Sequence, residues 1–176
     1  MSTDESLMMS AKMGDMNTIS TLYQRHKIGL YNYFLRRTNS ISQSEDLIQT
    51  VFEKVIKYRS TYNADVPFAP WLYRIAHNAH NDVYKKKPLS LPGEETINRL
   101  YEQPEESKND LSEKKMRLNR AIQQLTEEQQ HILMMTRYQQ MPYAEVAITL
   151  GCTEGAVKVK VHRTMKTLKK LVLNQV

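Results

Sequence analysis

The fold of the C-terminal part is decided by one stretch, Tyr143-Ala-Glu-Val-Ala-Ile-Thr-Leu-Gly-Cys-Thr-Glu-Gly-Ala-Val-Lys-Val-Lys-Val-His-Arg163. Its centre holds Gly151, the residue type that most readily takes the left-handed conformation that ends a helix. Thr153 follows at a position suited to cap a second helix. Small residues flank the turn and apolar residues recur at helical spacing: Ala144, Ala147 and Ala156, with Val146, Leu150, Val157 and Val161. Two helices that cross tightly through such a turn form a helix-turn-helix, which this stretch predicts.

The second of these helices has two chemically different sides when it is laid out at about 100° per residue. The apolar side carries Val157, Val161, Thr164, Leu168, Leu171 and Val172. The opposite side carries Lys158, Val159, His162, Arg163, Lys166, Lys169 and Lys170, with Lys160 at the margin. A plain amphipathic surface helix would mix charge signs, but no acid lies between Lys158 and Lys170. The pattern therefore favours a helix that enters the major groove of DNA.

A second helix rich in aromatic and basic residues is expected from Trp71 to Lys87, ending before Pro88. Its apolar side is expected to hold Trp71, Leu72, Ile75, Ala76, Ala79 and Val83. The remaining side holds Tyr73, Arg74, His77, Asn78, His80, Asn81, Tyr84 and Lys85. Rings, amides and cations together suit unpaired bases, which stack and expose their pairing edges. An ordinary polar face gives a similar pattern, so this helix alone does not establish a nucleic-acid site.

An all-α protein is predicted by the small number of glycines, five in 176 residues, and by the scarcity of alternating apolar and polar runs. We expect two small helical domains, 1–87 and 111–176, joined by a flexible acidic linker over 88–110. Asp15 is expected to cap a long helix, and capping boxes are expected at 42–45 and 126–129. Pro70 suits the first turn of its helix.

Charge is unevenly distributed along a chain whose formal net charge is +6 and whose isoelectric point is about 9.3. The segment 88–113 holds seven acids against two bases, whereas 143–176 holds six bases against two acids. The basic ends favour polyanions as partners. A single cysteine excludes an intrachain disulfide, and no apolar run is long enough to span a bilayer. We therefore expect a cytoplasmic protein without membrane insertion.

Three blocks of the sequence follow one another in a recognisable order. Glu45-Asp-Leu-Ile-Gln-Thr-Val-Phe52 is similar to an Asp-Leu-x-Gln-x-x-Phe helix, and Trp71-Leu-Tyr-Arg-Ile-Ala-His-Asn78 to a Trp-Leu-x-x-Ile-x-x-Asn pattern. Leu125-Thr-Glu-Glu-Gln-Gln130 then leads into the helix-turn-helix. In this combination, which spans nearly the whole chain, the sequence resembles the bacterial extracytoplasmic-function (ECF) sigma factors, the minimal sigma subunits of RNA polymerase.

The resemblance implies partners and site residues. The partners are core RNA polymerase, promoter DNA and an anti-sigma factor, and no cofactor is implied. Contacts with the polymerase clamp are implied for Asp46, Leu47, Gln49 and Phe52. Contacts with the melted minus-ten strand are implied for Tyr62, Arg74, Ile75, Asn78, Tyr84, Lys85, Lys86 and Lys87. Contacts with the minus-thirty-five element are implied for Lys158, Val159, Lys160, His162, Arg163 and Lys166.

Two rival functions remain open on the sequence. His77 and His80 have a spacing compatible with a metal ligand pair, but a third ligand is missing, so solvated or core histidines are the simpler interpretation. Neither a phosphate-binding glycine loop nor a nucleophile elbow is present. An enzyme is therefore not expected. The stronger rival is a stand-alone helix-turn-helix regulator, which would bind a duplex operator without polymerase.

Overall fold

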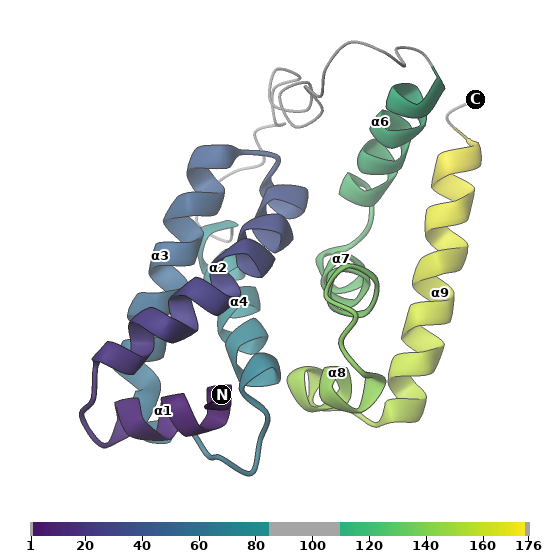
Figure 1. Cartoon of the computed structure of the whole chain (residues 1–176). Coiled ribbons are helices and arrows are strands. Elements are labelled where there is room, and N and C mark those ends of the chain that lie inside the picture. Colours follow the sequence, from purple (N-terminus) through teal and green to yellow (C-terminus); the bar gives the residue numbers. More distant parts are fainter. Residues whose placement is uncertain (1, 85–109, 175–176) are drawn as a thin grey trace.

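Every regular element that the computed structural model describes, over residues 2–84 and 110–174, is a helix (Figure 1). The N-terminal unit comprises α1 (Asp4–Lys12), α2 (Asn17–Thr38), α3 (Ile41–Tyr58), the 3₁₀ turn η1 (Arg59–Thr61) and α4 (Phe68–Tyr84). The C-terminal unit comprises α6 (Asp110–Gln123), α7 (Glu127–Leu133), the π-helical segment η2 (Met134–Tyr138), α8 (Tyr143–Leu150) and α9 (Glu154–Leu173). The predicted all-α class is confirmed, and the expected linker lies outside the described residues.

Local capping chemistry sets most helix starts. Thr126 and Gln129 form the expected capping box, and Thr153 accepts a hydrogen bond from the Ala156 amide at 3.2 Å. Gly151 ends α8 with a φ of 63°, as expected for a left-handed turn residue. The turn and the second helix of the helix-turn-helix therefore start where the sequence indicates.

Two capping predictions in the N-terminal unit are wrong. The 42–45 box does not form, because Asn39 ends α2 in the left-handed conformation and the extended Ser40 caps α3, accepting from the Gln43 amide at 3.3 Å. Asp15 lies one residue before the N-cap of α2, where its carboxylate accepts from the Asn17 amide at 3.1 Å. In both cases the backbone turn determines where the helix begins. The nearby polar side chain then accepts from one of the first backbone amides of the helix.

The core of the N-terminal unit lies between α2, α3 and α4, with α1 across one end (Figure 1). Its fully buried side chains include Leu22, Leu30, Phe34, Val51, Val55, Phe68 and Leu72. The start of α4 is held by α1, because a Glu5 carboxylate oxygen accepts from the Phe68 amide at 2.9 Å. Pro70 lies in the first turn of α4, as expected.

The C-terminal unit packs directly on the N-terminal unit, with α8 beside α4 and α6 beside α2 (Figure 1). Three side chains bond across the interface to carbonyl oxygens: Gln123 to Arg36 at 2.6 Å, Gln139 to Gly29 at 3.1 Å and Thr149 to Pro70 at 3.3 Å. The Arg36 guanidinium also lies 4.1 Å from the centre of the Tyr138 ring. A Cβ on Gly29 would lie 3.0 Å from side-chain oxygens of both Gln139 and Tyr73, so a larger residue at this position would make these two side chains shift.

This packing overturns part of the expected division of α4 into two faces. Tyr73 and His80 were expected on the polar face, but both are buried, at 3% and 4% exposure. Val83 was expected on the apolar side and is 36% exposed. The reason is tertiary, because the interface and the α2 side chains beside it cover a second stripe of α4 that the helical pattern alone assigns to solvent.

Candidate nucleic-acid and polymerase surfaces

Helix α9, the second helix of the helix-turn-helix, has one buried side and one exposed side. The apolar stripe is buried as expected, with Val157, Val161, Thr164 and Leu168 all below 9% exposure. The opposite side leaves Lys158, Val159, His162, Arg163 and Lys166 exposed. Lys160 is half-buried at the margin, and its ammonium group is paired with Glu128 of α7. Five of the six residues predicted for this surface therefore share one exposed face, and Lys160 would have to leave its carboxylate partner to join them.

A second exposed stripe lies on α4. Arg74 and Asn78 are exposed and one helical turn apart, and the half-buried Ile75 lies three residues before Asn78. This arrangement offers a cation, an amide and an apolar contact side by side. Tyr84, Lys85, Lys86 and Lys87 are predicted for the same surface, but their side chains lie outside the described part of the chain.

Tyr62, which is predicted for the strand-binding surface, lies inside the core instead. Its side chain is 1% exposed, packs edge-on against the Trp71 ring at 5.2 Å between centroids, and donates its hydroxyl to the Val66 carbonyl at 2.8 Å. Burial raises the pKa of this hydroxyl to about 12. Stacking of a base on Tyr62 would therefore require the loop over 62–67 to move.

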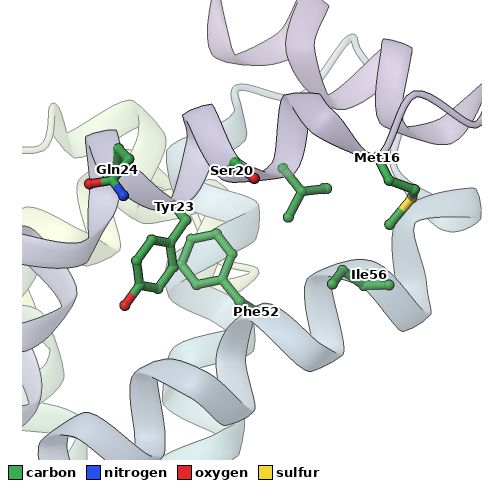
Figure 2. Close-up of a pocket in the computed structure, with 7 residues that line it drawn as sticks. Met16, Ser20, Tyr23, Gln24, Phe52 and Ile56 are labelled. Atoms are coloured by element: carbon green, nitrogen blue, oxygen red, sulfur yellow. The ribbon is translucent and has the colours of Figure 1, made fainter.

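The predicted polymerase residues on α3 divide into an exposed pair and a buried pair. Asp46 and Gln49 are exposed, whereas Leu47 is 4% and Phe52 6% exposed. The Phe52 ring faces the Tyr23 ring of α2 at 5.0 Å between centroids, and the two rings form part of a groove of about 410 Å³ (Figure 2). The groove is lined by Met16, Ile19, Ser20, Tyr23, Gln24, Phe52 and Ile56.

Comparisons with known proteins match both units. Residues 22–88 match the model described as Sigma-70 region 2, and residues 115–168 match Sigma-70, region 4, so that together they span well over half of the chain. The chain is an ECF sigma factor of the sigma-70 family. It is 27% identical to the RNA polymerase sigma factor YlaC of Bacillus subtilis, over 90% of this chain and 94% of YlaC.

One further relative and one solved structure are similar to the sigma factor over most of its length. It is 28% identical to the ECF RNA polymerase sigma factor BldN of Streptomyces coelicolor, over 94% of this chain and 64% of BldN. Its fold is similar to that of CnrH, solved in complex with the cytosolic domain of CnrY, with a TM-score of 0.76 and 21% identity over 98% of this chain and 99% of CnrH. These findings favour the sigma factor over the stand-alone regulator.

Several residues of the sigma factor that sequence reasoning did not select are brought together by the fold. Met16 and Tyr23, 40% and 37% exposed, form the α2 wall of the groove beside Phe52. Helical spacing puts Tyr23 on the same apolar stripe as Ile19 and Leu22, and only its position beside Phe52 of α3 reveals that it is partly exposed. At the interface between the two units, Tyr33 of α2, whose hydroxyl accepts from Arg37, contacts His131 of α7, and no local pattern signals such a contact.

Two other features of the sigma factor concern metals and membranes. Over residues 2–84 and 110–174, no cluster of three or more histidine, cysteine, aspartate or glutamate residues is placed to hold a metal ion. His77 and His80 both contact the Arg37 guanidinium, at 3.4 and 3.1 Å from their Nδ1 atoms. Burial, and then the charge of Arg37, lower the pKa of His80 to about 3. Within the same residues, no helix is long and apolar enough to cross a membrane.

Proposed function

We propose that this sigma factor uses three separate surfaces during initiation, with domains at 1–87 and 111–176 joined by a tether over 88–110. The exposed side of α9 reads the minus-thirty-five element as duplex DNA. The stripe of Arg74, Ile75 and Asn78 on α4 holds the melted minus-ten strand, and Tyr84 and Lys85 to Lys87 are proposed to contact the same strand. The exposed part of α3, at Asp46 and Gln49, docks on core polymerase together with Leu47 and Phe52.

One observation carries most of the proposal for α9. Among the residues predicted for this surface, its exposed side presents three cations and one aliphatic side chain after the Gly151 turn: Lys158, Arg163, Lys166 and Val159. Arginine and lysine reach phosphates and guanine acceptors, and a valine contacts a thymine methyl group. Glu154 partly neutralises Lys158 at 3.0 Å, which leaves Arg163 and Lys166 as the stronger phosphate or base contacts.

Capture of the opened strand requires no chemical step by the protein. An extruded base loses stacking energy of a few kcal/mol, and contacts with an amide and an apolar side chain offset part of that cost. Asn78 supplies the amide and Ile75 the apolar contact, while Arg74 attracts the backbone. Because Tyr62 is buried, we propose that it joins the pocket only after the 62–67 loop moves.

The groove beside α3 extends the proposed polymerase surface onto α2. Tyr23 and Met16 provide exposed apolar area next to the Phe52 ring, and Asp46 and Gln49 provide a polar edge. An apolar centre with a polar rim is typical of a protein interface. We further propose an anti-sigma factor as a partner, since the sigma factor RpoE of Bartonella quintana, which has a similar fold, was solved in complex with the anti-sigma factor NepR. We also propose a cytoplasmic location, where polymerase works.

Run-off transcription with core polymerase and pooled genomic fragments tests the proposal. We expect new transcript starts that require both the chain and core polymerase. Initiation that is absent at every fragment, together with tight binding of the isolated chain to a duplex site, would establish the regulator instead.

The polymerase surface is tested by co-purification with core polymerase. The double variant Asp46→Ala, Gln49→Ala removes two exposed side chains and should weaken retention at least several-fold while leaving the helix content unchanged. Ser42→Ala, an exposed position in the first turn of α3, is the matched control and should be retained like the parent chain. Equal retention of the double variant would remove α3 from the proposal. Phe52 is unsuitable here because its ring also packs in the core.

A further inference from the structure

The interface between the two units contains an unusual cluster around one buried arginine. Arg37 is 4% exposed, and no carboxylate of the described residues pairs with it. Its guanidinium lies 2.6 Å from the Tyr33 hydroxyl and 3.1 Å from Nδ1 of His80. On the other side of Tyr33, the hydroxyl lies 2.8 Å from Nδ1 of His131, which belongs to α7 of the C-terminal unit. His131 is 1% exposed, and its ring stacks on that of His77 at 4.1 Å between centroids.

The direction of the hydrogen bonds fixes the protonation state of His131. A guanidinium can only donate, so the Tyr33 oxygen accepts from Arg37. The single phenolic hydrogen of Tyr33 then has Nδ1 of His131 as its partner, and this bond forms only when Nδ1 accepts and carries no hydrogen. His131 is therefore neutral when the two units are in contact. A second proton would place an imidazolium against the same phenol that already accepts from a buried cation.

The groups closest to His131 oppose its protonation, and the carboxylates nearby lie only at the edge of the cluster. Arg37 and Tyr33 face it from α2, Tyr73, His77 and His80 from α4, and Glu127 stands one turn earlier on α7 itself. On α9, which packs on the other side of α7, Lys160 is paired with Glu128. Burial, and then the neighbouring His77, Arg37 and His80, hold the pKa of His131 well below its usual value.

We propose that His131, seated on Tyr33, Arg37 and His77, is a proton-sensitive latch that holds the C-terminal unit on the N-terminal unit, and that protonation of His131 releases it. The rest of the interface consists of three side chain to carbonyl bonds, the Arg36–Tyr138 contact, and the packing of α4 on α8 and of α2 on α6, and none of the three bonds involves a histidine. The latch is therefore the part of the interface at which the binding of a single proton shifts the equilibrium from the latched to the separated state.

Release matters for initiation, and this step rests on the proposed function. The minus-ten and minus-thirty-five positions lie on the order of 80 Å apart along straight DNA, at about 3.4 Å per base pair. The longest helix of the chain, α2, is only about 33 Å long at about 1.5 Å per residue, and the two units are in contact. The latched arrangement therefore cannot place α4 and α9 on both elements at once, and acts as an autoinhibited state.

The pH dependence follows from proton linkage. The latched state binds fewer protons than the separated state, in which the His131 pKa returns to about 6.5. A depressed histidine pKa makes the latched state most favoured above that value and progressively disfavoured below it. One histidine lowers the latching equilibrium constant by about tenfold for each pH unit below about 6.5, until the pKa of the latched state is reached.

Two residue types that occur once each in the chain can be used to follow the separation of the two units. Its single tryptophan, Trp71, is on α4 of the N-terminal unit, and its single cysteine, Cys152, lies between α8 and α9. Their near neighbours Pro70 and Thr149 are bonded at 3.3 Å, so the two probes start close together. Energy transfer from Trp71 to a naphthylamine dye on Cys152 is measured on the free full-length chain from pH 8 to pH 5.5. Small-angle scattering of the unlabelled chain gives the radius of gyration under the same conditions.

We expect transfer to fall and the radius of gyration to rise below about pH 6.5 in the parent chain, with the helix content unchanged by circular dichroism. His131→Gln keeps an acceptor but cannot titrate, so it should stay latched across the range. His162→Gln, which removes an exposed histidine of α9, should behave like the parent chain in this DNA-free measurement. His131→Lys should separate already at pH 8.

Two outcomes overturn the latch: signals from the parent chain that do not change with pH, or a His131→Gln variant that separates on acidification as the parent does. The readout uses neither DNA nor polymerase. Failure of run-off transcription with intact pH-dependent separation would therefore reject the proposed function and retain the latch. The reverse result would reject the latch alone.

Discussion

Removal of the Tyr33 hydroxyl offers a quantitative test of the contact between the two units. Tyr33 is fully buried, and its hydroxyl accepts from Arg37 at 2.6 Å and donates to His131 at 2.8 Å. Tyr33→Phe leaves the aromatic packing on Phe34 and Tyr73 in place but removes both bonds. It also leaves one guanidinium N–H and one imidazole nitrogen without a partner inside the protein.

The expected cost is obtained from the two bonds. A hydrogen bond to a charged group contributes about 1.5–3 kcal/mol and a neutral one about 1 kcal/mol. The free energy of unfolding at pH 8 should therefore fall by roughly 2–4 kcal/mol, a large share of the 5–15 kcal/mol typical of a folded domain. With a urea slope of about 2 kcal/mol/M, the midpoint should fall by about 1–2 M.

Urea denaturation followed by circular dichroism is the assay, and Tyr73→Phe is the matched control. Tyr73 is also a buried tyrosine, with its ring 5.4 Å from that of Tyr33, but its hydroxyl forms no hydrogen bond with any described residue. Its removal should change stability by no more than about 0.5 kcal/mol. If the two variants differ from each other by less than that amount, the reasoning about the Arg37, Tyr33 and His131 contacts is refuted.

The remaining predictions concern the DNA surfaces and one helix cap. Asn78→Ala should reduce permanganate reactivity of the promoter bubble more than it reduces duplex binding, and an equally open bubble would rule out its contact with an unpaired base. Arg163→Ala should cost about 1–3 kcal/mol of promoter binding if the side chain reads a base; a uniform loss across promoter variants in gel-shift titrations would indicate a phosphate contact instead. Ser40→Ala should lower stability by about 1 kcal/mol in thermal melts, whereas Ser42→Ala should have almost no effect, and the opposite order would restore the 42–45 capping box.

The elements of this sigma factor were largely predictable because they depend on short-range chemistry. Gly151, Thr153 and the Thr126 box act within three or four residues of the groups they satisfy, so their signals survive in the sequence alone. The apolar stripe of α9 is equally local, since it follows from helical periodicity. The order of motifs was enough to indicate the family, which the matches to Sigma-70 region 2 and region 4 then established.

The exposure of the candidate site residues was predictable only for side chains on a helix face that no other element covers. Arg74 and Asn78 on α4, and Arg163 and Lys166 on α9, are exposed as the helical pattern indicates. Tyr62 was expected at the strand-binding surface but is buried. The aromatic packing against Phe68 and Trp71 that buries it depends on how the loop before α4 folds back. The family resemblance that implies a role for Tyr62 does not indicate whether its ring reaches the surface.

What the sequence by itself determined is therefore the all-helical class, the caps at Thr126, Gly151 and Thr153, and the exposed basic face of α9, because each depends on neighbours within about one turn. What only the tertiary structure decided is the contact of the two units. Tyr33 and His131 are 98 positions apart, and the burial of Arg37 and His80 depends on packing between helices that no local pattern encodes. A buried guanidinium needs acceptors around it, and only the packed helices determine which histidines and tyrosines provide them.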